Sequence, residues 1–262
     1  MRILLSNDDG IHARGLSELK KELEKTGDVW VVAPLQERST TGHSLTIHKP
    51  LRIVEMGRRE YAVSGSPADC IYLGVRQVLK GRRPDFVVSG INRGANLGQD
   101  VYYSGTVAAA REGCMMGIPA LAVSLGIDFD KLPAERELHY STAARIAARL
   151  IKELRGTRLP EYTFLNLNVP DVVLSKVKGV RLAGQGFRFY DNRILKRKDH
   201  RGRNYFWIGG FYKGYCRKCE TDCMAVDKGY AALTPMKIDS TDVDFMATMG
   251  GLAHAVGERI KP

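Results

Sequence analysis

The first 34 residues read as a strand, a helix and a second strand, and this order constrains the fold more than any other feature of the chain. The apolar run 3–5 is followed by leucines at helical spacing, at positions 16, 19 and 23, and then by a second apolar run, 28–34. A helical crossover between two strands makes them parallel, so their carboxyl ends open on the same edge of a sheet. The chain is therefore expected to form an α/β fold with a mostly parallel sheet.

The same alternation continues to about residue 176. Ser66-Pro67-Ala68-Asp69 places a hydroxyl cap, a proline in the first turn and an acid three residues after the cap, which predicts the start of a helix that Gly81 ends. The other predicted elements are a hairpin at 51–56 and 61–63, strands at 84–89, 118–125 and 163–169, and helices at 104–116 and 133–154.

The pattern changes from about Val177 to short strands, aromatic residues and turns, with a last periodic segment from Asp242 to about Arg259. The sequence has no internal repeat and no linker rich in Pro, Gly or Ser. We therefore expect one domain over 1–262, with a core at about 1–176 and hairpins and a helix at about 177–262. An irregular, β-rich final third of this kind often makes subunit contacts, so we expect it to serve oligomerisation.

Composition indicates the cellular compartment of the protein and the charge of its partners. No apolar run approaches the roughly 20 residues of a membrane helix, and the N-terminus lacks the pattern of a signal peptide, which predicts a cytoplasmic protein without a membrane partner. Five cysteines, an odd number, favour reduced thiols over a disulfide framework. The net charge of +11 favours anionic partners, whether phosphorylated metabolites, polyphosphate or nucleic acid.

The densest basic run lies at 196–203, and Tyr205, Phe206 and Trp207 follow it directly. A nucleic-acid surface has this composition, but a solvated hairpin or a subunit contact is the commoner meaning of such a run.

Polar side chains follow three of the predicted strands. Asp8 and Asp9 come after the first, Ser39 after the second and Asn92 after the third. If these strands are parallel, all four residues lie on one edge and form an all-oxygen set that suits Mg²⁺ or Mn²⁺. The alternative is that each residue has an ordinary structural role. One aspartate would then cap a helix and the other would be solvated, while Ser39 would be a turn hydroxyl and Asn92 a loop amide.

A second candidate site lies at the start of a predicted helix. Ser104-Gly105-Thr106 offers unpaired backbone N–H groups, hydroxyls and a glycine, which is how proteins hold phosphate, and the same groups also serve as an ordinary helix cap. Asn96 is placed to reach the same anion, and Arg38 or Arg93 to neutralise its charge. A phosphate beside a metal indicates phosphoryl transfer or hydrolysis.

Six short motifs occur in order along the chain. They are Ser6-Asn7-Asp8-Asp9-Gly10; Ala33-Pro34 with Arg38-Ser39; Ser64-Gly65-Ser66-Pro67 with Asp69; Ser89-Gly90-Ile91-Asn92 through Gly94, with Asn96-Leu97-Gly98; Tyr103-Ser104-Gly105-Thr106-Val107; and a C-terminal set of Thr221-Asp222, Gly229-Tyr230 and Thr234-Pro235. Together they resemble the survival protein E (SurE) family of metal-dependent 5′-nucleotidases over nearly the whole chain.

This resemblance implies a Rossmann-like three-layer α/β/α core, a C-terminal part that exchanges between subunits, and a homodimer or homotetramer. It implies hydrolysis of nucleoside 5′-monophosphates with one divalent cation per subunit, and in some members hydrolysis of 3′-nucleotides or short polyphosphate. By the same resemblance the metal ligands are Asp8, Asp9, Ser39 and Asn92, and the residues around the phosphate are Asn96, Ser104, Gly105 and Thr106.

The chain departs from the family pattern in two places. Thr40 stands where many members have glycine, which leaves the shape of the Ser39 loop open. Cys216, Cys219 and Cys223 form a cluster that we do not associate with the family, and reduced structural thiols are favoured over a zinc or iron–sulfur site because no fourth ligand is evident nearby, unless His200 or another subunit supplies it.

The mechanism predicted from these residues is metal-assisted hydrolysis in which Asp8 or Asp9 also accepts a proton, and in which His43 is a candidate donor to the leaving oxygen. An aspartyl-phosphate phosphatase is disfavoured because those enzymes typically separate their two aspartates by one residue. The turn after the first strand also lacks the Gly-x-Gly-x-x-Gly pattern of dinucleotide-binding oxidoreductases. The alternative from another class is a nucleic-acid or stress-response binding module that uses the basic surface.

Overall fold

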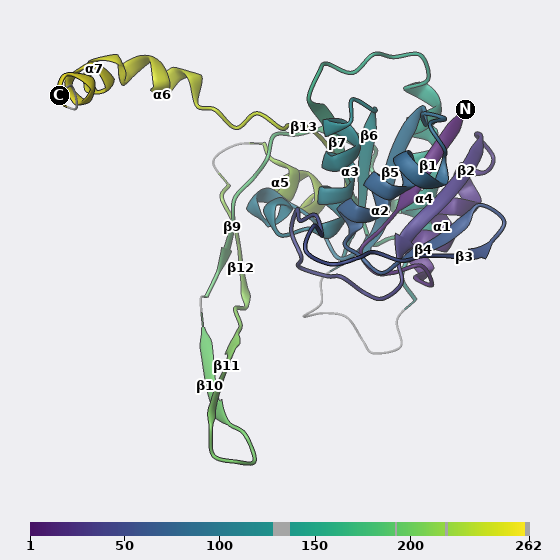
Figure 1. Ribbon diagram of the computed structural model, residues 1–262, viewed down its shortest axis with the longest axis horizontal. Coiled ribbons are helices and arrows are strands. Elements are labelled where there is room, and N and C mark those ends of the chain that lie inside the picture. The colour runs from purple at the N-terminus through teal and green to yellow at the C-terminus, as the bar shows by residue number, and fades with distance from the viewer. Residues whose placement is uncertain (128–136, 192, 218–219, 260–262) are drawn as a thin grey trace.

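A sheet of nine strands forms the centre of the computed structural model, which describes residues 1–127, 137–191, 193–217 and 220–259 (Figure 1). The strand order is β3-β4-β2-β1-β5-β6-β7-β13-β8. Six adjacent strands are parallel, which confirms the predicted mostly parallel sheet. They are β4 (Glu60–Val63), β2 (Asp28–Pro34), β1 (Arg2–Ser6), β5 (Phe86–Arg93), β6 (Ala120–Gly126) and β7 (Thr163–Pro170). At one edge β3 (Ile53–Gly57) pairs antiparallel with β4 as the predicted hairpin.

Helices cover both faces of this sheet and make the predicted α/β/α layers. On one face, α1 (Arg14–Leu23) and α4 (Tyr140–Glu153) pack through residues such as Leu19 against Ile3 and Leu5. On the other face, α2 (Pro67–Leu73) and α3 (Gly105–Met115) pack against Leu4. Alternate residues of β1 thus enter opposite cores, as the two-residue period of a strand requires.

The helix boundaries follow local chemistry where caps are present. Ser66 caps α2 through a reciprocal pair of hydrogen bonds with Asp69, and the helix continues as a π-helical turn at Gly74–Val78. The helix predicted from residue 133 begins only at Tyr140, because residues 137–139 are not helical, while 128–136 lie outside the described residues.

Strand β5 is longer than predicted, and this places Asn92 on a strand instead of in a loop. Its pairing with β6 shifts register between Ser89 and Asn92. Gly90 permits the irregularity: its φ is +135°, and a Cβ there would lie 2.2 Å from the carbonyl oxygen of Val123. The strand therefore carries on through a bulge to Arg93, where the sequence predicted an end at 89.

The strand order reverses between β1 and β5. From β1 the chain proceeds outward to β2 and β4, and from β5 it proceeds in the other direction to β6 and β7. In doubly wound sheets, ligands bind outside the carboxyl ends of the strands at this point of reversal. The residues that follow β1 and those at the end of β5 are therefore the first place to look for a site.

The C-terminal third returns to the main sheet and also extends away from it. Strand β13 (Ala231–Lys237) pairs antiparallel with β7, and β8 (Val180–Leu182) pairs parallel with β13, with α5 (Asp222–Asp227) between them in sequence. The short strands predicted after residue 177 and the last periodic segment are confirmed, the latter as α6 (Val243–Thr248) and α7 (Gly250–Arg259). Two short 3₁₀ segments, η2 (Gly98–Tyr102) and η4 (Leu174–Lys176), join the larger elements.

A two-stranded projection, here called the arm, spans residues 188–215. Strands β9 (Arg188–Tyr190) and β12 (Tyr212–Tyr215) form its base, and β10 (Ile194–Lys198) and β11 (Asn204–Ile208) form its far part. Figure 1 shows the arm leaving the body in one direction and α6 with α7 leaving it in another. None of the helices in the described ranges is long and apolar enough to span a bilayer.

Candidate metal and phosphate site

Asp8 lies at the carboxyl end of β1 and is held by the start of α3. Its side chain is buried, and its Oδ1 accepts a hydrogen bond of 2.5 Å from the Thr106 hydroxyl while Oδ2 accepts one of 3.1 Å from the Thr106 backbone N–H. The carbonyl oxygen of Asp8 accepts the Arg38 N–H at 2.7 Å. The strand, the helix start and the loop after β2 therefore meet at this one residue.

Asp9 is half-buried beside it, and its Oδ2 accepts the Arg93 backbone N–H at 3.1 Å. Burial raises the pKa of Asp8 despite the hydrogen bonds from Thr106. Burial, and next the charge of Asp8, raise the pKa of Asp9 to about 6. Two adjacent carboxylates whose ionised forms are both disfavoured make a place where a bound cation is electrostatically favourable.

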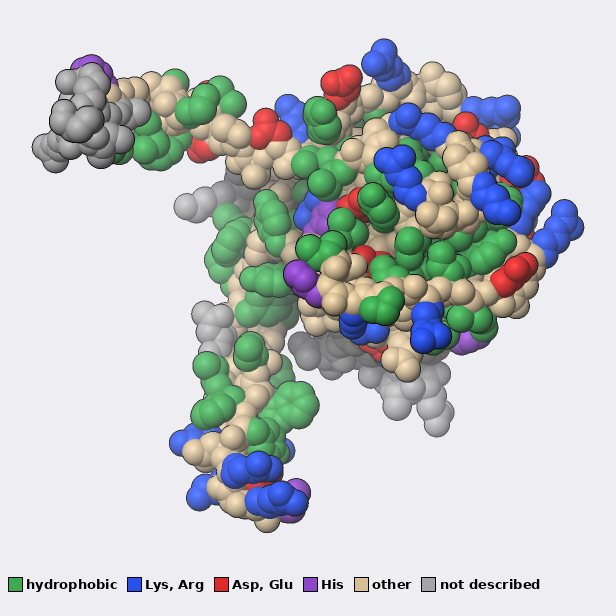
Figure 2. All heavy atoms as spheres, viewed as in Figure 1, with side chains coloured by type: hydrophobic (Ala, Val, Ile, Leu, Met, Phe, Trp, Pro, Cys, Tyr) green, Lys and Arg blue, Asp and Glu red, His purple; other side chains and the backbone are tan. Residues whose placement is uncertain are grey.

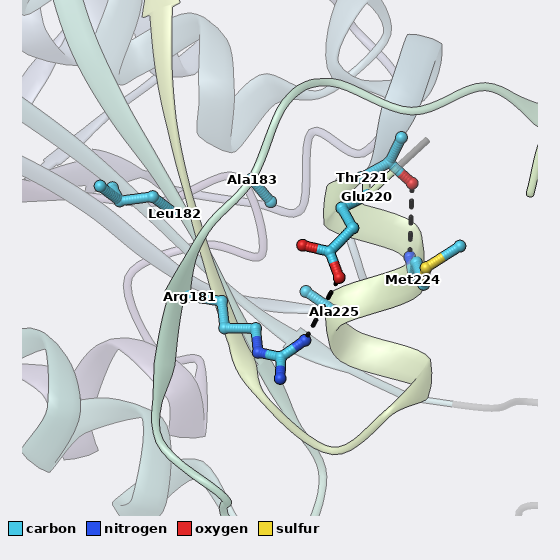
Figure 3. Close-up of a pocket in the computed structure, with 7 residues that line it drawn as sticks. All are labelled: Arg181, Leu182, Ala183, Glu220, Thr221, Met224 and Ala225. Atoms are coloured by element: carbon cyan, nitrogen blue, oxygen red, sulfur yellow. Dashed lines mark hydrogen bonds and ion pairs between the residues drawn. The ribbon is translucent and has the colours of Figure 1, made fainter. Parts of the chain in front are cut away.

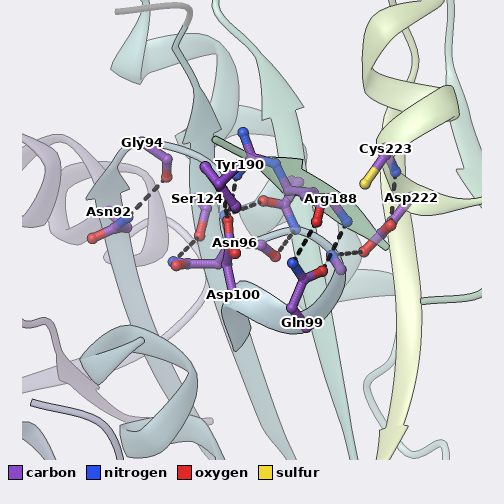
Figure 4. A network of polar contacts seen from close by, with 12 residues as sticks. Asn92, Gly94, Asn96, Gln99, Asp100, Ser124, Arg188, Tyr190, Asp222 and Cys223 are labelled. Atoms are coloured by element: carbon purple, nitrogen blue, oxygen red, sulfur yellow. Dashed lines mark hydrogen bonds and ion pairs between the residues drawn. The ribbon is translucent and has the colours of Figure 1, made fainter. Parts of the chain in front are cut away.

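Asn92 presents its side-chain oxygen to the same point. Its Nδ2 donates to the carbonyl oxygen of Gly94 at 2.8 Å (Figure 4). Its Oδ1 lies 3.5 Å from the Thr106 Oγ1 that also contacts Asp8. The long Thr106 contact is a weak hydrogen bond, so this oxygen retains acceptor capacity. The structure thus brings Asn92 and Asp8 together through Thr106.

Ser39 follows β2 as predicted, in the exposed loop whose neighbouring residue Arg38 contacts Asp8. Its hydroxyl donates to Glu37 Oε1 at 2.6 Å. The structure therefore brings the serine loop to the edge that carries the aspartates but turns the hydroxyl itself toward Glu37.

Thr40, the departure from the family's glycine, adopts a φ of +57°. This left-handed conformation is the one that glycine adopts without steric cost and that a β-branched residue disfavours. The loop therefore keeps a glycine-like backbone although its sequence has lost the glycine.

His43 anchors the other end of this loop. Its Nε2 lies 2.9 Å from Oε2 of Glu112, a buried residue of α3, and the nearby Gly42 N–H donates to the carbonyl oxygen of Tyr103 at 3.1 Å. The histidine that the sequence suggested as a proton donor is thus paired with a buried carboxylate, where it fixes the Ser39 loop to α3.

The oxygen set at this edge fits a hard divalent cation. Within the described part of the chain, no three His, Cys, Asp or Glu side chains converge as at a zinc or iron site. The groups that do converge are carboxylate and amide oxygens, which suit Mg²⁺, Mn²⁺ or Ca²⁺. The donor chemistry and the raised pKa values of the two aspartates both match such an ion.

At the helix start Ser104–Thr106, several groups that could hold a phosphate already form hydrogen bonds within the protein. Ser104 caps α3, its Oγ accepting the Val107 N–H at 3.0 Å, and the Thr106 N–H and hydroxyl both point to Asp8. A Cβ on Gly105 would lie 2.8 Å from Cβ of Asp8, so glycine is what lets the helix approach the aspartate so closely. The N-terminus of α3 therefore binds the carboxylate of Asp8, one of the candidate metal ligands.

Asn96 belongs to a buried amide network that sequence reasoning missed. Its backbone N–H donates to Oδ1 of Asn168 at 2.8 Å and its Nδ2 donates to Oγ of Ser124 at 2.8 Å, while its carbonyl oxygen accepts from Asn166 and Asn168 at 2.9 and 3.0 Å (Figure 4). These contacts tie the glycine-rich segment after β5 to β6 and β7. The signal that could have found them is the pair of alternating asparagines in an otherwise apolar buried strand.

Two hollows on the surface of the described residues lie away from this site. The small pocket in Figure 3 lies against β8 and α5, where Arg181 and Glu220 approach to 3.8 Å, and its roughly 10 Å³ hold about one water. A larger hollow of about 440 Å³ includes Met1, Phe86 and Pro119, which precede β1 and β6 or begin β5 at the opposite edge of the sheet. The concentration of polar side chains therefore identifies the candidate site.

The cysteine cluster is described only in part. Cys216 and Cys223 are free thiols, and burial is the main cause that raises the pKa of Cys223 to about 12. Cys219 lies outside the described residues, so the choice between structural thiols and a thiol-bound metal stays a prediction.

These features define a class: a doubly wound α/β protein with paired carboxylates, an amide oxygen and a helix N-terminus at the point where its strand order reverses. Comparison with known proteins makes the class specific. The family model described as "Survival protein SurE" matches residues 3–192. The chain belongs to the SurE family, and the resemblance stated from the sequence is confirmed.

Relatives match over nearly the full chain. A protein of Geobacter metallireducens named "5′-nucleotidase SurE" is 45% identical over 95% of this chain and 96% of its own length. One of the same name from Geobacter sulfurreducens is 46% identical over 92% and 90%. The crystal structure of the SurE protein from Aquifex aeolicus superposes with a TM-score of 0.85 at 37% identity, covering 97% of this chain and all of that one.

Proposed function

We propose that this chain is a 5′-nucleotidase that hydrolyses nucleoside 5′-monophosphates to a nucleoside and phosphate. The observation that carries the proposal is the 45% identity, over almost the full length of both chains, to a relative named for this activity. The cluster of Asp8, Asn92 and Thr106 at the switch point of the sheet supports it, because phosphate-ester hydrolysis uses such oxygen sets. The binding-module alternative has no support among the relatives' names.

The metal ligands in this proposal are Asp8, Asp9, Ser39 and Asn92, which would hold one Mg²⁺ or Mn²⁺ per subunit. When bound, the cation supplies the positive charge that offsets the phosphoryl oxygens. Thr106 orients Asp8 through its hydroxyl and backbone N–H. Asp9, which lies beside Asp8 at the same edge of the sheet, is the residue proposed to accept a proton from the attacking water.

The substrate phosphate is proposed to lie against Ser104, Gly105, Thr106 and Asn96, with short polyphosphate or 3′-nucleotides as further substrates. Asn96 is rigidly placed by Ser124 and Asn168, which supports a role in positioning. We also infer a homodimer or homotetramer built through the C-terminal third, and a cytoplasmic location, which suits the free thiols at Cys70 and Cys114.

The test is a phosphate-release screen over nucleoside 5′- and 3′-monophosphates and short polyphosphate, with Mg²⁺, with Mn²⁺ and with chelator. Wild-type protein should release phosphate from a 5′-monophosphate only when a divalent cation is present. Asp9→Asn should reduce this activity at least about 100-fold, because it removes a charged ligand and the proposed base.

The matched control is Asp28→Asn, which neutralises an exposed aspartate at the amino-terminal end of β2. It should retain full activity. A fully active Asp9→Asn protein would refute the site assignment, whereas chelator-resistant activity would refute the metal.

A further inference from the structure

The first part of the Ser39 loop is fixed to the turn that carries the two aspartates. The Arg38 N–H donates to the carbonyl oxygen of Asp8 at 2.7 Å. A Cβ placed on Gly10 would lie 3.5 Å from the backbone nitrogen of Glu37, so this part of the loop packs directly against the turn. The residues on either side of Arg38, which are Glu37 and Ser39, therefore lie next to the candidate metal site.

The far part of the same loop is fixed to α3. Nε2 of His43 lies 2.9 Å from Oε2 of the buried Glu112. Between the two anchors, the hydroxyl of Thr41 donates to the carbonyl oxygen of Arg38 at 2.9 Å. Because the backbone is held on both sides of Ser39, the main freedom left to this residue is the rotation of its hydroxyl.

Glu37 determines how the Ser39 hydroxyl is turned. The hydroxyl donates its hydrogen to Oε1 of Glu37 at 2.6 Å. A serine hydroxyl has one hydrogen to donate and two lone pairs, so a hydrogen directed to Glu37 leaves both lone pairs for a cation. Hydrogen-bond partners of metal ligands orient those ligands, and their loss typically weakens metal binding about 10- to 100-fold. The contact with Glu37 thus prepares the Ser39 oxygen for a cation.

Glu37 also adds negative charge to a protein that is strongly basic. The chain has a net charge of +11, and Figure 2 shows Lys and Arg side chains over much of the visible face of the body. Burial and the charge of Asp8 raise the pKa of Asp9 most, and the charge of Glu37 raises it further, so the three carboxylates act on one place. Glu37 is exposed and solvent screens its charge, which makes the hydrogen bond from Ser39 its larger effect.

We propose that Glu37 is a positioning residue of the metal site, which accepts the hydrogen of the Ser39 hydroxyl and thereby raises the affinity of the site for a divalent cation. The inference rests on the proposed function, in which Ser39 is one of the metal ligands. Glu37 acts through Ser39 and does not itself bind the cation. Its effect on cation binding should therefore disappear when Ser39 is replaced.

The test measures binding of Mn²⁺ alone to the full chain at pH 7.5, from the electron paramagnetic resonance signal of free Mn²⁺. Ser39→Ala and Glu37→Ala should each weaken binding about tenfold, because the first removes the oriented oxygen and the second its orientation. Glu37→Ala/Ser39→Ala should bind no more than about twofold more weakly than Ser39→Ala, because the two side chains act as a unit. Glu37→Gln should stay within about threefold of wild type, since its amide oxygen still accepts the Ser39 hydrogen and only a screened charge is lost.

The matched control is Glu55→Ala, which removes an exposed glutamate of β3 and should bind Mn²⁺ with wild-type affinity. All variants should melt at about the wild-type temperature, because the replaced side chains are exposed. A Glu37→Ala protein that binds Mn²⁺ as tightly as wild type would overturn the inference. Losses that add up in the double variant would also overturn it, because Glu37 would then act on the cation independently of Ser39.

The same measurements separate this inference from the proposed activity. Unchanged Mn²⁺ affinity of Ser39→Ala would overturn both the proposed ligand set and the inference. The expected pattern of Mn²⁺ binding in a wild-type protein that releases no phosphate would support the inference and refute only the nucleotidase activity. In an active protein, saturating Mn²⁺ should restore phosphate release by Glu37→Ala to nearly the wild-type rate, and a rate that stays low would overturn the assignment of Glu37 as a positioning residue.

Discussion

Replacing Asp9 by asparagine should stabilise the metal-free protein at neutral pH while abolishing its response to a divalent cation. Burial and the neighbouring Asp8 carboxylate raise the pKa of Asp9 from 3.8 to about 6. The ionised side chain is therefore less favourable in the folded protein than in the unfolded chain. Asparagine has nearly the same shape without the charge, and its oxygen can still accept the Arg93 N–H that now donates to Asp9.

The magnitude follows from the pKa difference. At about 1.4 kcal/mol per pH unit, a rise from 3.8 to about 6 costs about 3 kcal/mol of unfolding free energy once both states are ionised. The half-buried side chain is partly screened by solvent, which lowers this to about 2 kcal/mol. For a chain of this length, that corresponds to a rise in melting temperature of about 4–8 °C.

The sign with pH is determined by the raised pKa. A carboxyl group whose pKa is higher in the folded state contributes stability below its unfolded pKa and loses it as pH rises through about 6. The advantage of Asp9→Asn should therefore be complete at pH 7.5 and reduced to about a third at pH 4.5, because the carboxyl group is then mostly protonated in the folded protein. Added Mg²⁺ or Mn²⁺ should raise the melting temperature of wild type at pH 7.5 and leave that of the variant unchanged.

The assay is differential scanning fluorimetry in chelator and then in excess Mg²⁺ or Mn²⁺, at both pH values. Asp28→Asn is again the control, because the Arg59 guanidinium lowers the pKa of Asp28 and its replacement should bring no gain in stability. An Asp9→Asn protein that is no more stable than wild type in chelator at pH 7.5, or that is equally favoured at pH 4.5, would refute the electrostatic reasoning.

Two further substitutions probe the backbone of the site. Gly105→Ala should destabilise the fold by about 1–3 kcal/mol and reduce phosphate release, because its Cβ would lie 2.8 Å from Cβ of Asp8. The control is Gly184→Ala, which has open space around the new Cβ and should melt at the wild-type temperature. Equal melting temperatures of the two variants would contradict this. Thr40→Gly should raise the melting temperature by about 2 °C. The strain energy of Thr40 in its left-handed conformation, which glycine does not have, exceeds the entropic cost of glycine by about 0.5–1 kcal/mol. A lower melting temperature would show that Thr40 is not strained.

Much of the parallel sheet could be predicted because its strands are apolar runs with clear ends. Strand β2 occupies 28–34 as expected, since the run is unbroken and Pro34 ends it. The extension of β5 could not be predicted, because it depends on the space that Val123 of the neighbouring strand leaves to Gly90. The antiparallel pairing of β13 with β7 could not be predicted either, because the local sequence of 231–237 does not indicate with which strand it pairs.

The candidate site was predictable at the level of which residues share an edge, because parallel strands place their carboxyl ends together. The bonds between them were not. The pairing of Thr106 with Asp8 depends on how closely α3 packs on β1, and the pairing of His43 with Glu112 joins a loop to a helix 69 residues away. Both hydrogen bonds result from tertiary packing and cannot be inferred from the spacing of residues along the chain.

The place of β13 in the sheet has a consequence for synthesis on the ribosome. Strand β7 is buried along its whole length, yet the strand that covers it on one side is translated only about sixty residues later. Until then the nascent chain carries an open, apolar edge of the kind that captures strands from other chains. A chain truncated before residue 231 would therefore leave this edge of β7 unpaired, and we expect such a fragment to aggregate.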